Sequence, residues 1–342
     1  MKRFFRLRYL FWLVVPLLLW WALRDIPLTE VWTVLRQLTP GQILILLAAN
    51  IVVLLLFSAR WWIISRAQGY PIPYLTLAGY RLAAFGVSYF TPGPQFGGEP
   101  LQVYLTERNH NIPRATAISA VSLDKLLELL FNFTFLTFGM MTVLQWQIFP
   151  GAIGQQAMTI AVALLILVTG LLLAVLAGRH PVSNLWKITV QWLPRPIVDV
   201  SSTYDNIYQT IKDSEDQTAQ FFQQHPLTMG LALSVSAITV VAMVGEFWLA
   251  THFLGLELNF VQVISLLTAA RIAFLLPAPG GLGALEISQV LAFTALGLNP
   301  AIGISLTLLI RVRDTVLAAS GLLWGGIILQ STKEYGRVSI KT

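Results

Sequence analysis

Residues 91–99 read TPGPQFGGE, and residues 277–286 read PAPGGLGALE. Each stretch interrupts a strongly apolar segment with proline and glycine and ends in a glutamate placed to open a new helix. The residues that follow repeat as two series: Glu99, Pro113, Lys125 and Glu128, then Glu286, Pro300, Arg311 and Asp314. The intervals are 14, 12 and 3 residues in the first series and 14, 11 and 3 in the second. Two interrupted apolar segments in corresponding halves indicate a transporter-type site at mid-membrane.

The composition predicts an all-α polytopic membrane protein. Apolar residues make up 56% of the 342 residues, charged residues 11%, and the mean hydropathy is +0.70. A soluble domain carries roughly a quarter charged residues. The chain has no cysteine, which excludes disulfides and thiolate metal sites, and its four histidines are far apart. We therefore expect no metal and no cofactor.

Six apolar stretches are long enough to cross the bilayer, for which a helix needs about 20 residues. They lie near 9–23, 41–64, 115–145, 152–177, 227–253 and 300–330. With the N-terminus in the cytoplasm, fourteen Lys and Arg residues fall in cytoplasmic segments and only Arg24 and Arg36 outside. This bias predicts an inner-membrane protein with both termini in the cytoplasm. It also accounts for the net charge of +6 without any nucleic acid.

The two quoted breaks lie within further apolar elements, 74–109 and 259–298. Broken backbone at membrane depth is tolerated only where protein or a wet cavity surrounds it. Both elements are therefore predicted to be re-entrant helix pairs, the first entering from the cytoplasm and the second from outside. This arrangement makes residues 1–342 a single membrane domain with inverted repeats at 41–145 and 227–330. If either element crosses the membrane fully, the symmetry changes.

Residues 178–226 are predicted to be a cytoplasmic connector that contains an acidic, glutamine-rich helix. One face of that helix is apolar and carries Ile197, Val200, Tyr204, Ile207, Tyr208 and Ile211. We favour a solvated linker helix, as is usual for connecting segments. The alternatives are a helix that rests on lipid headgroups and a docking site for a soluble partner.

Charged residues inside apolar segments are the strongest functional signal, because a charge at the bilayer centre costs about 2.5–3.5 kcal/mol. They are Arg81, Glu99, Asp124, Lys125, Glu128, Glu246, Arg271, Glu286, Arg311, Arg313 and Asp314. Substrate binding is predicted for eight of them: Arg81, Glu99, Lys125, Glu128, Arg271, Glu286, Arg311 and Asp314. Arg81 and Arg271 precede the two glutamates by 18 and 15 residues. Because an arginine beside exposed helix N-termini makes an anion site, these two and Arg311 are predicted to grip a phosphate.

The glutamates Glu99 and Glu286 fall in the first turn of their helices, where an acid complements the helix dipole. Their recurrence favours an added role, in which each carboxylate holds an amine, a proton or a coupling cation. Glu128 follows Lys125 by three residues, and Asp314 follows Arg311 by three. Each acid could therefore neutralise that base on one helix face, and this interpretation is as well supported as a role in the charge balance of the cavity. The re-entrant loops are predicted to contain Pro92, Gly93, Gly97, Gly98, Pro279, Gly280, Gly281 and Gly283.

Catalytic signatures are missing from the sequence. It has no serine–histidine, cysteine–histidine or HExxH arrangement, so no enzymatic activity is expected. The run Gly280-Gly281-Leu282-Gly283 is faintly like a nucleotide-binding loop, but it has neither a βαβ setting nor the lysine of a P-loop.

The chain resembles the flippase-like transmembrane family, whose best-known member is the membrane half of lysylphosphatidylglycerol synthase. The resemblance rests on Gly97-Gly98-Glu99-Pro100, Asp124-Lys125 and Glu128, and on residues 279–286 followed by Arg311. It implies a lipid-translocating domain whose cavity accepts an anionic or aminoacylated phospholipid. It implies no synthase activity, since only about a dozen residues follow the last predicted span. The chain has Gln102 where relatives commonly have a base, and Asp124-Lys125 where Glu-Arg is common, so headgroup specificity transfers least.

Taken together, these features predict a membrane protein that binds a phospholipid or polyprenyl-phosphate lipid between inverted halves and moves its headgroup across the bilayer. Two other hypotheses remain open. One is a membrane-embedded enzyme or accessory subunit that acts on glycolipids, and the other is a scaffold for a soluble partner that docks on the connector.

Overall fold

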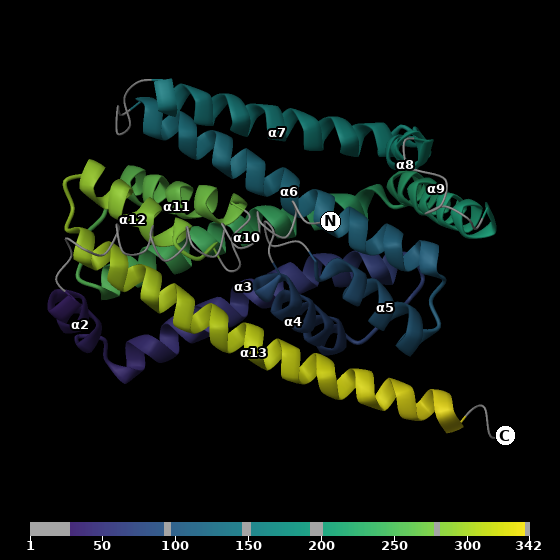
Figure 1. The fold of residues 1–342 in the computed structure, drawn as a ribbon, viewed down its shortest axis with the longest axis horizontal. Coiled ribbons are helices and arrows are strands. Elements are labelled where there is room, and N and C mark those ends of the chain that lie inside the picture. Colours follow the sequence, from purple (N-terminus) through teal and green to yellow (C-terminus); the bar gives the residue numbers. More distant parts are fainter. Residues whose placement is uncertain (1–27, 92–96, 146–151, 192–200, 277–280, 339–342) are drawn as a thin grey trace, which may run out of the picture.

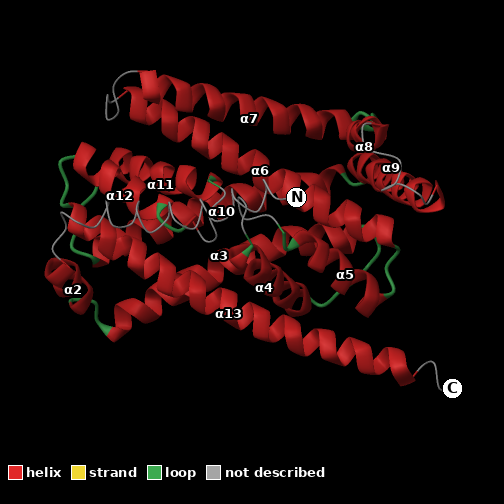
Figure 2. Ribbon diagram, in the orientation of Figure 1, coloured by secondary structure: helices red, strands yellow, loops and turns green. Residues whose placement is uncertain are grey.

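A computed structural model describes the chain except for residues 1–27, 92–96, 146–151, 192–200, 277–280 and 339–342. The described part is built from twelve α-helices (Figures 1 and 2). Those of the first half are α2 (Leu28–Arg36), α3 (Pro40–Ala67), α4 (Tyr74–Phe90), α5 (Glu99–His110), α6 (Arg114–Gln145) and α7 (Ala152–Leu176). They are followed by α8 (Pro181–Gln191), α9 (Ser201–Gln224), α10 (Pro226–Phe253), α11 (Phe260–Leu275), α12 (Ala284–Ala295) and α13 (Pro300–Val338).

Four of these helices are long and apolar enough to cross a bilayer: α3, α6, α10 and the Gly154–Leu176 part of α7. They coincide with four of the six predicted spans. The predicted span at 9–23 lies outside the described residues, and the span at 300–330 falls on α13. There the charged residues Arg311, Arg313 and Asp314 interrupt the apolar surface, and α13 is not one of the four. The part of the chain that the structure describes has helices as its regular structure throughout, and the chain is a polytopic membrane protein.

Each of the two elements with a proline and glycine break is divided into two short helices. The first gives α4 and α5, with 17 and 12 residues, and the second gives α11 and α12, with 16 and 12. All four are shorter than the roughly 20 residues of a span. In Figure 1, α5 lies toward one end of the molecule and α11 and α12 toward the other, with α4 nearer the middle. Glycine is needed at the first break, because Gly97 has φ +131° and a Cβ at Gly98 would overlap the carbonyl oxygen of Ala84.

Helices of the two halves pack across one another. α3 packs along α10, α4 lies along α13, and α11 packs on α6 (Figure 1). Small residues allow the close approach of α4 and α13. A Cβ at Gly321 would overlap the carbonyl oxygen of Leu82, and a Cβ at Gly86 would lie 2.6 Å from that of Ala318. Such contacts are the usual basis of helix association in lipid, where apolar side chains gain little from leaving the solvent.

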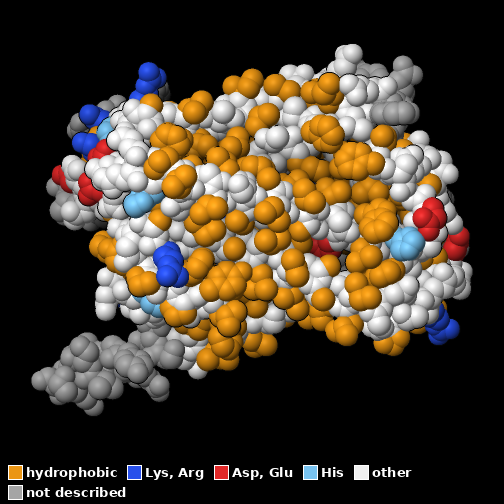
Figure 3. Space-filling model, turned by 180° about the vertical axis from the view of Figure 1, so that it is seen from behind, with side chains coloured by type: hydrophobic (Ala, Val, Ile, Leu, Met, Phe, Trp, Pro, Cys, Tyr) orange, Lys and Arg blue, Asp and Glu red, His pale blue; other side chains and the backbone are white. Residues whose placement is uncertain are grey.

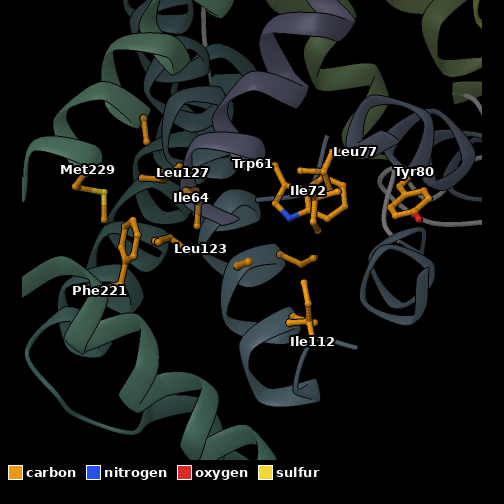
Figure 4. Close-up of a cluster of buried hydrophobic side chains, with 14 of the residues drawn as sticks. Trp61, Ile64, Ile72, Leu77, Tyr80, Ile112, Leu123, Leu127, Phe221 and Met229 are labelled. Carbon is orange, nitrogen blue, oxygen red and sulfur yellow. The ribbon is translucent and has the colours of Figure 1, made fainter. Parts of the chain in front are cut away.

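The second half of the predicted connector belongs to the core. Phe221 of α9 is 3% exposed and packs in one cluster with Ile64, Leu123, Leu127 and Met229 (Figure 4). The hydroxyls of Ser119 on α6 and Thr218 on α9 are hydrogen-bonded at 2.9 Å. The prediction of a solvated linker helix is therefore wrong for this part of α9. The burial of α9 could not be predicted from hydropathy, because its buried residues are separated by polar ones along the sequence.

Of the predicted apolar face of the connector, Ile197 and Val200 lie outside the described residues, and Ile207 is 38% exposed. Deletion of the connector would expose the cluster around Phe221, so a loss of function on deletion would not by itself indicate a docking partner.

The outer surface is apolar, as expected for a protein that faces lipid. Leu227, Val241 and Leu323 are 85%, 70% and 72% exposed. Figure 3 shows hydrophobic side chains across the middle of the molecule, with Lys and Arg mostly at one end. In water this surface would be an aggregation liability.

Candidate functional site

A cavity of about 730 Å³ lies between the two halves. Its walls come from α3, α4, α5, α6, α7, α10, α11 and α13, so both broken helix pairs contribute. Among the described residues, ten charged ones line it: Arg60, Arg81, Lys125, Arg271, Arg313, Glu99, Asp124, Glu128, Glu246 and Asp314. Five bases thus face five acids, and what the cavity can bind depends on how they are paired.

On the first side of the cavity, two arginines converge on the acids of α6. Arg60 Nε lies 2.6 Å from Asp124 Oδ1, and Arg81 Nη2 lies 2.8 Å from Asp124 Oδ2. Arg81 Nη2 also contacts Glu128 Oε2 at 3.0 Å, and Arg60 Nη2 approaches the same oxygen at 3.5 Å. The side chains of Arg60 and Asp124 are 2% and 3% exposed. This network holds α3, α4 and α6 together and matches the charge of both arginines.

Glu99 is held at the N-terminus of α5 by two kinds of contact. Its Oε2 accepts a hydrogen bond from the Gly97 N–H at 2.9 Å, and its Oε1 lies 3.1 Å from Lys125 Nζ. Lys125 also pairs with Glu128 at 2.8 Å. The Gly98 N–H donates to Ser88 Oγ at 2.9 Å. The N–H groups of Gly97 and Gly98 thus already donate to side chains of the protein. The sequence predicted that N–H groups at this helix start would bind an anion.

Glu286 is held in the same way at the start of α12. Its Oε2 accepts from the Gly283 N–H at 3.0 Å, and it forms a close ion pair with Arg311 of α13. Arg311 Nη2 also donates to the carbonyl oxygen of Gly281 at 3.0 Å. Each half therefore ties the glutamate of its broken helix to a base on the helix that follows. Glu286 and Arg311 are not among the residues that line the cavity.

The acids on the second side outnumber the base that they contact. Arg313 forms a close ion pair with Glu246 of α10 and also contacts its neighbour Asp314 at 2.8 Å. Asn50 Nδ2 of α3 donates to Glu246 Oε1 at 3.1 Å. One base therefore serves two carboxylates, which leaves one negative charge in excess here.

Arg271 of α11 is the fifth base of the cavity wall, and its charge offsets this excess. It forms no direct ion pair with the carboxylates among the described residues. Within the part of the chain that the structure describes, no carboxylate lies within the 4.0 Å of an ion pair, and its side chain contacts Met243 Sδ at 3.1 Å. Glu128, Glu246 and Asp314 are close enough to act on it electrostatically. Its guanidinium therefore carries N–H donors for which no carboxylate among the described residues serves as an acceptor, and these donors match the chemistry of an anion.

The remainder of the wall is mostly apolar and reaches the outer surface at α7. Leu164, Leu167 and Leu171 line the cavity, and Leu167 is 64% exposed. Val240 and Met243 of α10 line it as well. The cavity thus combines a charged interior with an apolar side formed by α7 and α10. Among the described residues, no group of three or more His, Asp or Glu side chains is arranged to hold a metal ion.

The structure brings six of the eight predicted binding residues to the cavity wall, and Glu286 and Arg311 pair outside it. Of the predicted loop residues, Gly98 lines the cavity, whereas Pro92, Gly93, Pro279 and Gly280 lie outside the described residues. Gly97, Gly281 and Gly283 have positive φ angles beside the two glutamates.

Four charged residues of the wall were not among the predicted binding residues: Arg60, Asp124, Glu246 and Arg313. Their charge inside an apolar helix was a signal available from the sequence. It was weakest for Arg60, which is close to the paired tryptophans of a helix end.

Comparison with known proteins gives one consistent family. Residues 10–321 match the lysylphosphatidylglycerol synthase TM region family. A UPF0104 membrane protein of Methanocaldococcus jannaschii is 23% identical over 300 residues, which cover 85% of this chain and 86% of the relative. Another, from Pyrococcus horikoshii, is 21% identical over 337 residues, covering 94% and 95%. A third, from Methanothermobacter thermautotrophicus, is 20% identical over 293 residues, covering 83% and 84%. The sequence motifs and these matches agree, and the chain belongs to the lysylphosphatidylglycerol synthase TM region family of membrane proteins.

Proposed function

We propose that this protein binds a phospholipid or polyprenyl-phosphate lipid in the cavity and moves the lipid headgroup across the bilayer. The observation that carries the proposal is Arg271, an arginine with no ion-pair partner among the described residues, in the wall of a cavity with an apolar side. An unmatched charge at membrane depth is costly and is normally kept for a ligand. A lipid phosphate would give the Arg271 guanidinium a direct anionic partner, and the acyl chains of the lipid would lie against the leucines of α7.

In this proposal Arg271 is the phosphate anchor, and the other predicted arginines support the site. Arg81 already contacts Asp124 and Glu128, and Arg311 contacts Glu286. The acids Glu246 and Asp314 share one base, so an ammonium group of an aminoacylated headgroup would be favourable beside them. A headgroup that carries both a phosphate and an amine would therefore match both sides of the cavity.

We further propose that the chain has six spans and two re-entrant pairs arranged as inverted repeats. α3 and α10 both begin with proline and contain 28 residues. Ten residues into each lie Asn50 and Ser236, and ten further on lie Arg60 and Glu246. Arg60 donates to Ser236 Oγ at 3.1 Å and Asn50 to Glu246 Oε1 at 3.1 Å, which are equivalent contacts under a twofold exchange of the halves.

The packing of α4 on α13 and of α11 on α6 would be equivalent under the same exchange. Alternating exposure of the shared cavity would follow from rocking one half against the other. The bias of basic residues favours an inner-membrane location with both termini in the cytoplasm. The proposal includes no chemical change to the lipid.

The test replaces Arg271 with alanine and with lysine. Flipping of fluorescent phosphatidylglycerol and phosphatidylethanolamine would be measured in proteoliposomes. A hydrogen bond to a charged group contributes about 1.5–3 kcal/mol, so Arg271→Ala should lower the rate roughly 10- to 150-fold. Arg271→Lys should retain part of it, because lysine keeps the charge and loses the bidentate geometry.

Arg114→Ala is the matched control, since Arg114 is 63% exposed and pairs with Glu107 at the surface. Thermal stability separates function from folding, because a variant that keeps the wild-type melting temperature has kept the fold. Wild-type flipping by a folded Arg271→Ala variant would refute the role of this residue. Failure of the wild-type protein to flip any phosphate-bearing lipid would refute the proposed function.

A further inference from the structure

The short helix α8 occupies a distinctive place, directly after α7. Gly178 has φ +70°, and the chain reverses there through bonds from the Gly178 N–H to the carbonyl of Val175 and from the Arg179 N–H to that of Ala174, both 2.9 Å. In Figure 1, α7 is seen from the side, whereas α8 is seen nearly along its axis. α8 therefore runs across the end of α7. α7 has the length and apolarity of a membrane span, so a helix that follows its end and runs across it would lie at the level of the membrane surface.

One face of α8 is fixed to the protein. Glu215 of α9 accepts hydrogen bonds from the N–H groups of Val182 at 2.7 Å and Ser183 at 3.3 Å. Ser183 is fully buried, and Trp186 on the same face is partly buried. A carboxylate at the N-terminus of a helix satisfies its exposed N–H groups and complements its dipole. This contact sets which side of α8 faces outward.

The outward side of α8 is apolar. Val182, Leu185 and Ile188 follow one another at intervals of three residues and are 42%, 61% and 54% exposed. A second outward strip, with Asn184 and Lys187, is polar and also exposed. With 3.6 residues per turn, α8 thus has three strips: one against the protein, one apolar and one polar.

We propose that the apolar strip of α8 is immersed in the interfacial region of the leaflet at which α7 ends. Amphipathic helices bind there by burying apolar side chains below the headgroups. Leu173, in the last turns of α7, is 60% exposed, so the strip continues the lipid-facing surface of that helix. Arg179, in the turn before α8, and Lys187, on the neighbouring polar strip, are exposed and complement anionic headgroups.

The chemistry favours a lipid surface over a protein partner. Three side chains on an eleven-residue helix offer far less than the roughly 800 Å² that each partner buries in a stable protein interface. Immersed in the leaflet, α8 would fix the depth of α7 and, through Glu215, the position of α9 at the membrane surface. This inference does not depend on the lipid-flipping proposal.

The absence of native cysteine allows a clean test in the full-length protein. Single cysteines at Leu185 and Ile188, with Asn184→Cys and Lys187→Cys as matched neighbours, would carry a nitroxide label in nanodiscs of phosphatidylcholine and phosphatidylglycerol. Collisions with oxygen, which concentrates in the bilayer, and with a water-soluble nickel chelate would be compared. We expect labels at Leu185 and Ile188 to favour oxygen at least threefold over those at Asn184 and Lys187.

Equal access of the nickel chelate to all four positions would refute the proposal, because it would place the apolar strip in water. Shielding of Leu185 and Ile188 from both reagents would also refute it, since it would indicate a protein contact. A second comparison uses Arg179→Gln and Lys187→Gln in the Leu185→Cys background. Removal of the two charges should reduce the oxygen preference in discs that contain phosphatidylglycerol and leave it unchanged in discs of phosphatidylcholine alone. An equal change in the oxygen preference of the label in both kinds of disc would refute the role of the two charges.

Discussion

Replacement of Asp124 with asparagine should strongly destabilise this protein. The carboxylate contacts Arg60 Nε at 2.6 Å through Oδ1 and both terminal nitrogens of Arg81 at 2.8 Å through Oδ2. Its side chain is 3% exposed. Asparagine has nearly the same shape, so the change removes a charge with little change in packing. Arg60, Arg81 and the nearby Lys125 would then face only the carboxylates of Glu128 and Glu99.

The expected magnitude follows from the burial of this network. Removal of one partner of a buried ion pair typically costs about 3–5 kcal/mol, because the remaining charge is left without compensation. Two arginines lose their shared partner here, so we expect the upper part of that range. The exposed pair of Arg114 and Glu107 serves as the comparison. For such a surface pair, removal of one partner lowers the free energy of unfolding by up to about 1 kcal/mol.

The free energy of unfolding would be measured by denaturant titration in mixed micelles for the wild type, Asp124→Asn, Arg81→Gln and the control Glu107→Gln. Addition of Arg81→Gln to Asp124→Asn should restore part of the loss, because the numbers of bases and acids then match again. Coupling energies between contacting residues are typically 0.5–3 kcal/mol. The reasoning is refuted if Asp124→Asn costs no more than Glu107→Gln, or if the double variant loses the sum of the two single losses.

Two further changes test the packing and the lateral side of the cavity. Gly321→Ala should lower the unfolding free energy by about 1–3 kcal/mol, because the added methyl group overlaps the carbonyl of Leu82. Gly326→Ala, where a Cβ meets nothing within 4 Å, should be neutral or stabilising, and equal effects of the two changes would contradict the close contact. Leu167→Trp should reduce lipid flipping severalfold in proteoliposomes by narrowing the cavity. Ile166→Trp is its control, since Ile166 is 66% exposed and does not line the cavity; identical rates for the two variants would exclude entry beside Leu167.

Several features of the fold could be predicted because they depend on neighbours in sequence. Apolar stretches of about 20 residues gave four spans that the helices confirm. The proline and glycine breaks gave the divided helix pairs, and Glu99 and Glu286 do lie at the starts of α5 and α12. The contact of Lys125 with Glu128, three residues away on one helix, was likewise one of the two interpretations that the spacing allowed.

Contacts between distant segments could not be predicted in this way. Arg60 and Asp124 are 64 residues apart, and Arg313 and Glu246 are 67 apart. The series that ends in Arg311 and Asp314 suggested a pair within one helix. In the structure Arg311 contacts Glu286, 25 residues away, and Asp314 contacts Arg313. Polar spacing similarly hid the burial of α9, since Phe221 finds its partners on α3, α6 and α10.

The amino-acid sequence by itself determined that this is a membrane protein, where its helices break and which charges lie inside apolar segments. These properties follow from hydropathy and from the backbone preferences of proline and glycine, which act over a few residues. Only the tertiary structure decided which of those charges neutralise one another. That choice depends on where α3, α4, α6, α10, α11 and α13 cross, and it leaves Arg271 in the cavity wall without a carboxylate partner among the described residues.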